Sequence, residues 1–274
     1  NGNIAIANST LTGDGVNSSG GALSLTNTAI TGGGVNTSSG NISLTRLTIT
    51  GAPNDGVNSS TGAVTLVESA VTNSGSSGVS TDSGALSLTR SLVSGSSGEG
   101  VRSSSGAISV VNSTLSGNEV GIIASTSVVT IDASTITLSQ EEGIEGSTPA
   151  ITITNSILAG NSPNCGVAIT SAQFTMSSDA SCNLVGSGNR PSTNPLLGPL
   201  ANNGGPTLTH LPQPGSPAID AASNALCQAV DQRNFARPVD GNGDGTATCD
   251  MGAVEAAAGT VPPPVQPPPP SQPI

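Results

Sequence analysis

The segment Gly21–Ser60 reads "GALSLTNTAITGGGVNTSSGNISLTRLTITGAPNDGVNSS" and contains nearly the same sequence twice. Alignment of the chain with itself extends this repeat to eight units, with a period of 19 residues for the first two steps and 21 or 22 afterwards. A repeat this short is typical of a solenoid, in which each unit is one coil that stacks on its neighbours.

Each unit places apolar residues at four fixed positions, and no polar residue interrupts these columns. The first two positions alternate with a polar residue, as Leu23 and Leu25 flank Ser24. Alternation is the period of a strand with one buried face, whereas β-branched residues and glycines disfavour a helix. The first column is Ile4, Leu23, Ile42, Val64, Leu86, Ile108, Val129 and Ile151; the fourth is Val16, Val35, Val57, Val79, Val101, Ile122, Ile144 and Val167.

We therefore predict an all-β fold: a right-handed parallel β-helix (β-solenoid) of about eight regular coils of 19–22 residues, with irregular C-terminal coils and a cap. Coils about 4.8 Å apart would stack equivalent residues in ladders, and right-handed crossovers are strongly preferred. A glycine precedes each residue of the fourth column and is expected at a tight turn, from Gly15 to Gly166.

One column of the repeat carries charge. Arg46, Glu68 and Arg90 hold the same place in units three to five, which predicts an alternating ladder on the outside of the coils. Each exposed pair would contribute about 0.5 kcal/mol to the register. A solvated face that only avoids stacking like charges explains the pattern equally well.

Composition limits the core and the partners. The chain has 274 residues, 36 Gly, 19 Pro, no Trp, Tyr or Lys, and a net charge of −11. Its core must therefore consist of Val, Ile, Leu and Ala. The acidic balance argues against nucleic acid as a partner. No apolar run approaches the roughly 18 residues of a membrane helix, so we expect no membrane span in this segment.

Four cysteines lie in the last 110 residues, at Cys165, Cys182, Cys227 and Cys249. An even number in a Ser/Thr-rich chain without Lys predicts two disulfides and an oxidising, extracellular compartment. Sequence order favours Cys165 with Cys182 and Cys227 with Cys249 among three possible pairings.

The residues offer little for catalysis. The repeats contain no Lys or His, and their carboxylates lie mostly in turns, so we expect no enzyme and assign no catalytic residue. Glu141, Glu142 and Glu145 favour a solvated turn over a site. His210, the single His, favours a structural role over a Ser/His/Asp triad.

The stretch "DGNGDG", 240–245, places Asp240, Asn242 and Asp244 at alternate positions, as in the first half of an EF-hand-like calcium loop. The twelfth position is Met251 instead of a bidentate acid, and Asp250 lies one residue short. Two interpretations stay open: a Ca²⁺ ion held by Asp240, Asn242, Asp244 and Asp250, or an Asx turn without metal. We predict no other cofactor.

Several longer motifs carry a resemblance: "NPLLGPLANNGGPTLTHLPQPGSPAIDA", "DQRNFARPVDGNGDG" and "CDMGAVE" near the C-terminus, with "LTNTAITGGG" and "VNSTLSGNEVG" in the repeats. Together they resemble the secreted bacterial right-handed parallel β-helix proteins of the choice-of-anchor Q type, with repeats like those of polymorphic outer-membrane proteins. The resemblance implies a cell-surface protein with an interchangeable anchor and no attached enzymatic activity. The chain departs from it in closing on "GAVEA", where the family usually ends in aromatic residues.

Three regions follow from these patterns: regular repeats over 1–169, degenerate coils and a disulfide-stapled cap over 170–258, and a Pro-rich tail over 259–274. We expect a non-enzymatic extracellular rod that serves as a cell-surface stalk or adhesin, or as a filament subunit. The chain begins directly on a full repeat, which favours end-to-end self-association because unpaired strand edges accept another copy.

Two alternatives accompany this hypothesis. β-Solenoids include proteins that bind or degrade polysaccharides, and a glycan assay tests that interpretation. Outward Ser and Thr ranks, such as Ser24 with Thr26, also suggest an ice-binding face, although Val67, Val111 and Asp132 interrupt the ranks. Thermal hysteresis of a concentrated solution tests the ice-binding interpretation.

Overall fold

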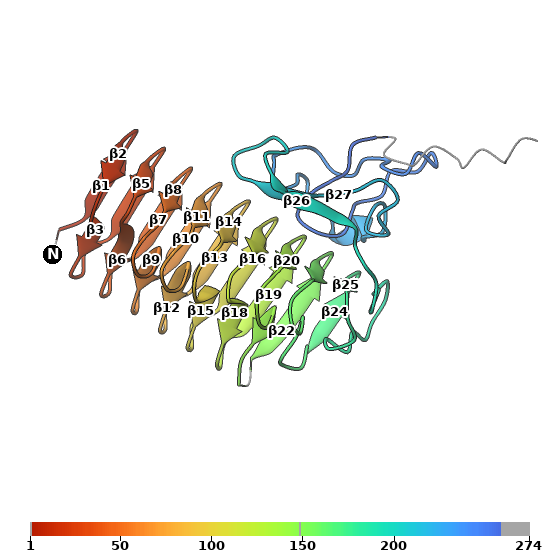
Figure 1. Cartoon of the computed structure of the whole chain (residues 1–274), viewed down its shortest axis with the longest axis horizontal. Helices are drawn as coiled ribbons and strands as arrows, with labels where there is room; N and C mark the ends of the chain where they lie inside the picture. Colours follow the sequence, from red (N-terminus) through yellow and green to blue (C-terminus); the bar gives the residue numbers. More distant parts are fainter. Residues whose placement is uncertain (1, 148, 259–274) are drawn as a thin grey trace, which may run out of the picture.

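The computed structural model describes residues 2–147 and 149–258, and it shows a β-solenoid with a C-terminal segment folded back along one side (Figure 1). Each of the first seven coils contributes one strand to each of three parallel sheets, named A, B and C, and the last two coils contribute strands to sheets A and B only. All pairings within these sheets are parallel, and equivalent strands of successive coils are neighbours. The predicted all-β solenoid is therefore confirmed.

The three sheets differ in the number and length of their strands. Sheet A contains β1 (Ile4–Ala7), β4 (Leu23–Thr26), β7 (Ile42–Thr45), β10 (Val64–Val67), β13 (Leu86–Thr89), β16 (Ile108–Val111), β19 (Val128–Asp132), β22 (Ala150–Thr154) and β24 (Ser171–Gln173). Sheet B contains β2 (Thr10–Thr12), β5 (Ala29–Thr31), β8 (Thr48–Thr50), β11 (Ala70–Thr72), β14 (Leu92–Ser94), β17 (Thr114–Ser116), β20 (Thr135–Thr137), β23 (Ile157–Ala159) and β25 (Met176–Ser177). Sheet C contains β3 (Gly15–Ser18), β6 (Gly34–Thr37), β9 (Val57–Ser59), β12 (Val79–Thr81), β15 (Glu99–Ser103), β18 (Val120–Ala124) and β21 (Ile144–Glu145).

The ladders follow the register that the repeat predicts. Ile4 pairs with Leu23, Leu23 with Ile42, and the column continues in this way to Ile151. From Leu23 onward its members are almost fully buried, and they form the interior of the coils with the other apolar columns. The strands β24 and β25 add a ninth, irregular coil after the eight regular ones.

The end of the fourth column is a correction to the sequence alignment. Ile144 bridges to Cys165, and Val167 lies in the loop that follows. Asn164 takes the place predicted for Gly166, because its carbonyl accepts the Ile144 amide hydrogen. A buried cysteine behaves as a small apolar residue, so Cys165 can occupy the fourth apolar column. The sequence alignment places Val167 there because the pair Gly166–Val167 matches the Gly-Val pattern of the other units.

The corner between sheets A and B holds one residue per coil at positive φ: Asn8, Asn27, Arg46, Glu68, Arg90, Asn112, Ala133, Asn155 and Phe174. Asn is the non-glycine residue that adopts this conformation most easily, which explains its recurrence. The predicted charged column lies in this row. Arg90 pairs with Glu68 at 3.2 Å, while Arg46 Nε donates to Asn27 Oδ1 at 2.6 Å.

Next to this corner runs a column of buried hydroxyls, Ser69, Ser91, Ser113, Ser134 and Ser156. Each of the later four accepts the amide hydrogen of its counterpart in the preceding coil, as Ser113 Oγ does from Ser91 N at 3.0 Å. Each hydroxyl also donates to the carbonyl two residues before it. The serine column satisfies backbone groups that the turn leaves unpaired, which is why polar residues occupy it.

Residues 178–194 cover the last coil. Phe174 N donates to Ser187 O at 2.9 Å, and Arg190 N donates to Thr175 O at 2.8 Å. These contacts, together with the disulfide between Cys165 and Cys182, extend the solenoid beyond β25.

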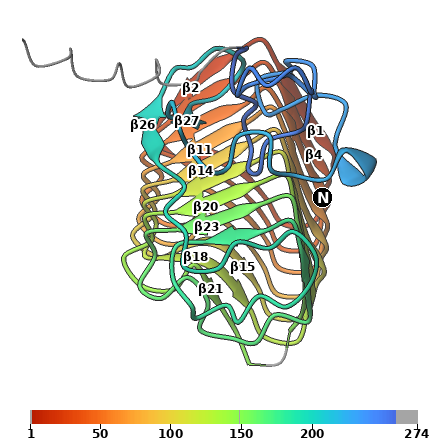
Figure 2. The same ribbon diagram turned by 90° about the vertical axis from the view of Figure 1, so that its right-hand side faces the viewer.

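Residues 195–258, named the flank segment, belong to the region predicted as degenerate coils and a cap over 170–258, and they lie along the outer face of sheet B (Figures 1 and 2). The segment contains the antiparallel pair β26 (Leu197–Ala201) and β27 (Thr209–Pro212) and the short 3₁₀ helix η1 (Asn224–Leu226). Its position follows from sheet B, whose outward residues in the later coils include the buried Leu92, Ile157 and Met176. These apolar side chains need a cover.

Candidate functional site

Sheet B is covered along only part of its length. Its outward residues are buried from β14 onward, because the flank segment packs on them. In the first four coils the same positions are partly or fully exposed: Thr10, Thr12, Ala29, Thr31, Thr48, Thr50, Ala70 and Thr72. Small side chains with hydroxyl and methyl groups thus form the open half of the sheet.

A cleft lies where the cover ends. Strands β8, β11 and β14 form one wall with Thr48, Ala70, Thr72 and Leu92, and the loop between β26 and β27 forms the other with Asn202 and 205–208. Its volume is about 330 Å³, and no charged side chain lines it. Glu68 lies beside it and accepts a hydrogen bond from Asn234 of the flank segment at 3.1 Å.

A second, shallower depression of about 490 Å³ continues from this cleft across the first three coils. Thr48 lines both depressions, and their lining residues come from coils one to five; we name the two together the sheet-B groove. Arg46 is its single charged lining residue, and its other polar groups are hydroxyls and amides, including Asn8 and Asn27. The groove can form hydrogen bonds and apolar contacts, but its lining offers no acid–base pair.

Sequence reasoning missed this groove. The signal was the second strand of the first four units, which reads "TLT", "AIT", "TIT" and "AVT" and presents small residues on its outward side. Nothing in the sequence indicated that the loop 202–208 would return beside these strands.

The charged residues of the C-terminal motifs are buried together. Arg233 pairs with Asp231 at 2.7 Å, and Arg237 pairs with Glu255 at 3.4 Å. Arg237 also donates to the carbonyls of Asp250 and Gly252 at 2.9 and 2.7 Å. With Asp250, this cluster contains three carboxyl groups and two guanidinium groups, all buried, so one carboxyl group has no cation of its own.

Burial, together with this surplus of carboxyl groups, raises pKa values in the cluster. Burial, followed by the nearby Glu255 carboxylate, raises the pKa of Asp250 to about 7. Burial also raises the pKa of Glu255, against the lowering effect of Arg237. Asp250 therefore carries a proton at mildly acidic pH in the folded chain and loses it near neutrality.

The flank segment should consequently be more stable at pH 5 than at pH 8. The folded pKa of Asp250 lies above its ordinary value of 3.8, so its stabilising contribution is complete below pH 3.8 and declines as the pH rises to about 7. We expect the contribution of Asp250 to the free energy of unfolding to fall by up to about 3 kcal/mol between pH 5 and pH 8. Denaturant unfolding across this range measures the slope. Asp250→Asn should flatten it and Asp244→Asn, in the exposed turn nearby, should not; equal slopes in both variants would contradict the assignment.

The loop 240–246 is a turn closed by its own side chains, and residues 243–246 of it are exposed. Asp240 accepts amide hydrogens from Gly243, Asp244 and Gly245, and Asn242 accepts one from Asp244. Asp250 lies buried behind the loop, where its carboxylate accepts the amide hydrogens of Asp220 and Ala256.

Of the four residues proposed to bind calcium, Asp240, Asn242 and Asp244 lie in one loop. The carboxylate of Asp250 instead accepts backbone amide hydrogens behind the loop. Within residues 2–147 and 149–258, no group of three or more His, Cys, Asp or Glu side chains is arranged to hold a metal. Calcium binding stays a hypothesis, and the melting temperature with and without a chelator tests it, since a bound ion stabilises the fold.

His210 lies between the flank segment and the solenoid. Its Nδ1 donates to the Gly198 carbonyl at 2.7 Å, so in the neutral ring Nε2 accepts from the Ser116 hydroxyl at 2.9 Å. Burial lowers the pKa of His210. Although a Ser–His pair resembles a nucleophile with its base, both side chains are buried and a backbone carbonyl replaces the orienting acid. The pair connects the two parts of the fold.

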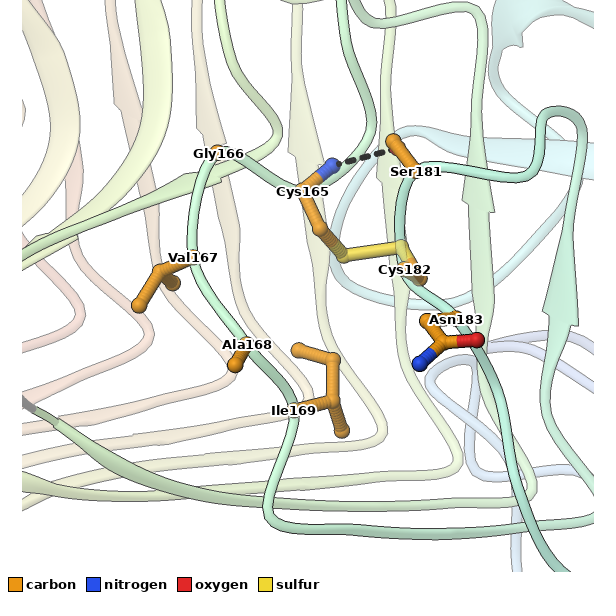
Figure 3. A pocket seen from close by; sticks show the side chains of 8 residues that line it. All are labelled: Cys165, Gly166, Val167, Ala168, Ile169, Ser181, Cys182 and Asn183. Atoms are coloured by element: carbon orange, nitrogen blue, oxygen red, sulfur yellow. Dashed lines mark hydrogen bonds between the residues drawn. A yellow bond between two sulfur atoms is a disulfide. The ribbon is translucent and has the colours of Figure 1, made fainter.

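Both disulfides have the connectivity that sequence order favoured, Cys165–Cys182 and Cys227–Cys249. The first lines a depression of about 330 Å³ at the end of the solenoid, with Val167, Ala168 and Ile169 opposite Cys182 and Asn183 (Figure 3). Ser181 Oγ accepts the Cys165 amide hydrogen at 3.0 Å beside the bridge. This depression contains no titratable side chain.

The acidic residues of the "SQEEGIEG" stretch follow the corner between sheets B and C. Burial raises the pKa of Glu145, and the charges of Glu142, Glu141 and Glu99 raise it further. Glu141 is exposed and Glu142 is partly exposed. No base partners them in the described residues, so they form a mutually repelling surface row.

Comparison with known proteins identifies the fold family. The family model for the right handed beta helix region matches residues 55–191, half of the chain. The chain therefore belongs to the right-handed β-helix family. Neither the curated proteins nor the solved structures contain a match. In the part of the chain that the structure describes, no helix has the length and apolar character to cross a membrane.

Proposed function

We propose that this chain is a non-enzymatic structural protein outside the cell, a rigid β-helical rod that acts as a surface stalk or adhesin, or as a subunit of a filament. The observation that supports the proposal is the burial of the side chains that could take part in catalysis. The single His and the densest cluster of opposite charges hold the flank segment against the rod, where they are buried from any substrate.

The C-terminal motifs support a relationship to anchored surface proteins. The stretches that resemble the choice-of-anchor Q type supply β26, β27 and the buried cluster of Asp231, Arg233, Arg237 and Glu255. The C-terminal motifs that carry the resemblance therefore lie in the flank segment, which packs against the solenoid. Two disulfides favour an oxidising environment, which agrees with an extracellular location.

A rod of this kind suits a stalk because the strands of sheets A, B and C pair from coil to coil along the length of the solenoid. Hydrogen bonds and ladders repeat on successive coils, and the flank segment contacts coils from the fourth, where Asn234 donates to Glu68, to the eighth, where Ser223 donates to Asn155. Such a brace opposes bending and separation of the coils.

The proposal is tested by incubating the purified protein with neutral and uronate polysaccharides and measuring released ends by chromatography. We expect no product above that of a heat-denatured sample. Negative-stain microscopy over a range of concentrations then separates the two forms of the proposal: rods of one length indicate a stalk, and growing chains of rods indicate a filament. Turnover of any glycan by the native protein would refute the non-enzymatic role.

A further inference from the structure

We propose that the sheet-B groove binds a strand of a neutral polysaccharide. This inference deepens the proposed function and rests on it, because a rod that does not cleave glycans can act as an adhesin by holding one. Shape, chemistry and charge of the groove support it independently.

The shape fits a linear polymer. The groove crosses five successive coils, from Asn8 and Thr10 in the first to Leu92 in the fifth. Stacked strands are about 4.8 Å apart, so equivalent positions recur at that interval along it. A polymer of similar rings would therefore contact similar groups on each coil. A compact ligand would contact only one or two coils and would gain nothing from this repetition.

The chemistry of the lining fits sugar rings, which present hydroxyl groups at their edges and C–H groups on their faces. Thr48, Thr72, Asn202 and Thr207 offer hydrogen-bonding groups, whereas Ala70, Leu92, Pro206 and Leu208 offer apolar contact. Ligand sites commonly combine an apolar lining with a few polar groups in this way.

An aromatic ring lies next to the groove. Phe235 is 50% exposed and packs against Gly204, where a β-carbon would lie 3.2 Å from the ring. The Arg233 guanidinium lies 4.5 Å from the ring centroid on one side. Phe235 therefore lies against the loop 202–208 that forms one wall of the groove, and half of its surface stays open to solvent for an apolar contact with a sugar ring.

The charge excludes polyanions as the preferred ligand. The protein carries a net charge of −11, and Arg46 is the only charged side chain in the lining. Glu68 lies near Arg46 on the same corner of the solenoid. Uronate polymers would be repelled by the overall field, whereas an uncharged glycan would not.

Affinity electrophoresis of the full chain tests this proposal. The gels contain a soluble β-glucan, xylan or galactomannan as neutral probes, and pectate or alginate as charged probes. We expect at least one neutral glycan to retard the native protein and the charged ones to leave it unaffected. Ala70→Arg, which fills the groove, should weaken retardation at least tenfold. Thr65→Arg, on the outward face of sheet A in the same coil, adds the same charge elsewhere and should bind as the native protein does.

If Ala70→Arg fails to fold, Leu208→Asp in the loop wall replaces it, with the same expected loss. Retardation by no neutral glycan, preference for the charged ones, or equal binding by groove and sheet A variants would overturn the proposal. These outcomes differ from a failure of the proposed function, because release of sugar products refutes the non-enzymatic role whether or not the groove variants bind.

Discussion

Replacing Arg237 by Met should release the flank segment from the rod. Arg237 is almost fully buried, and its guanidinium faces the carboxylate of Glu255 and the carbonyls of Asp250 and Gly252. Met roughly keeps the volume but removes the charge, so Glu255 stays buried without its cation. Breaking a buried pair in this way costs about 3–5 kcal/mol. We expect loss of that size in denaturant unfolding, with early proteolytic cleavage within 195–258 while the solenoid stays intact.

Arg102→Met is the matched control. Arg102 approaches Glu99 at 3.9 Å on the surface of sheet C, with 43% of its side chain exposed. Exposed pairs of this kind contribute little, so the change should stay within about 0.5 kcal/mol. Similar losses in the two variants would show that the buried cluster does not hold the flank segment.

The ladders of the solenoid could be predicted because their cause is local and repeated. Alternation around Ser24 defines a strand, and stacking at one period makes every pairing from Leu23 to Ile151 follow from the first. The limit of this reasoning is visible at Cys165. One step of the repeat is shorter than the alignment assumed, and a nearby Gly-Val pair offered a false match.

The position of the flank segment and the groove could not be predicted in the same way. They depend on contacts between residues about a hundred positions apart, such as Ser116 with His210 and Thr114 with Gln232. No periodicity encodes these contacts. The motif "DQRNFARP" was visible as a stretch of charges and polar groups, but only the fold shows that Asp231, Arg233 and Arg237 are buried.

The small residues of the repeat have a specific steric cause at the corner between sheets C and A. Gly21, Gly40, Gly62, Gly84 and Gly106 occupy one column there. A β-carbon on any of them would lie far inside van der Waals contact with the carbonyl oxygen of the equivalent glycine in the preceding coil, and for Gly84 the clash is with Gly62. Because the obstacle is backbone and not a flexible side chain, neither coil can yield without separating from the other.

Gly84→Ala should therefore be among the most damaging single-methyl changes in the rod. To accommodate the methyl group, coils four and five must move apart at this corner, which stretches the ladder hydrogen bonds beside it. We expect a loss of about 3 kcal/mol in the free energy of unfolding, at the upper end of the cost of overpacking. Gly117→Ala adds the same methyl group to a glycine with φ +64 and open space around it, so it should cost only the conformational strain of about 1 kcal/mol. Denaturant unfolding of both variants measures the difference. A larger loss for Gly117→Ala than for Gly84→Ala would contradict this explanation. It would show that glycine is required in this fold for its backbone conformation and not for the close approach of successive coils.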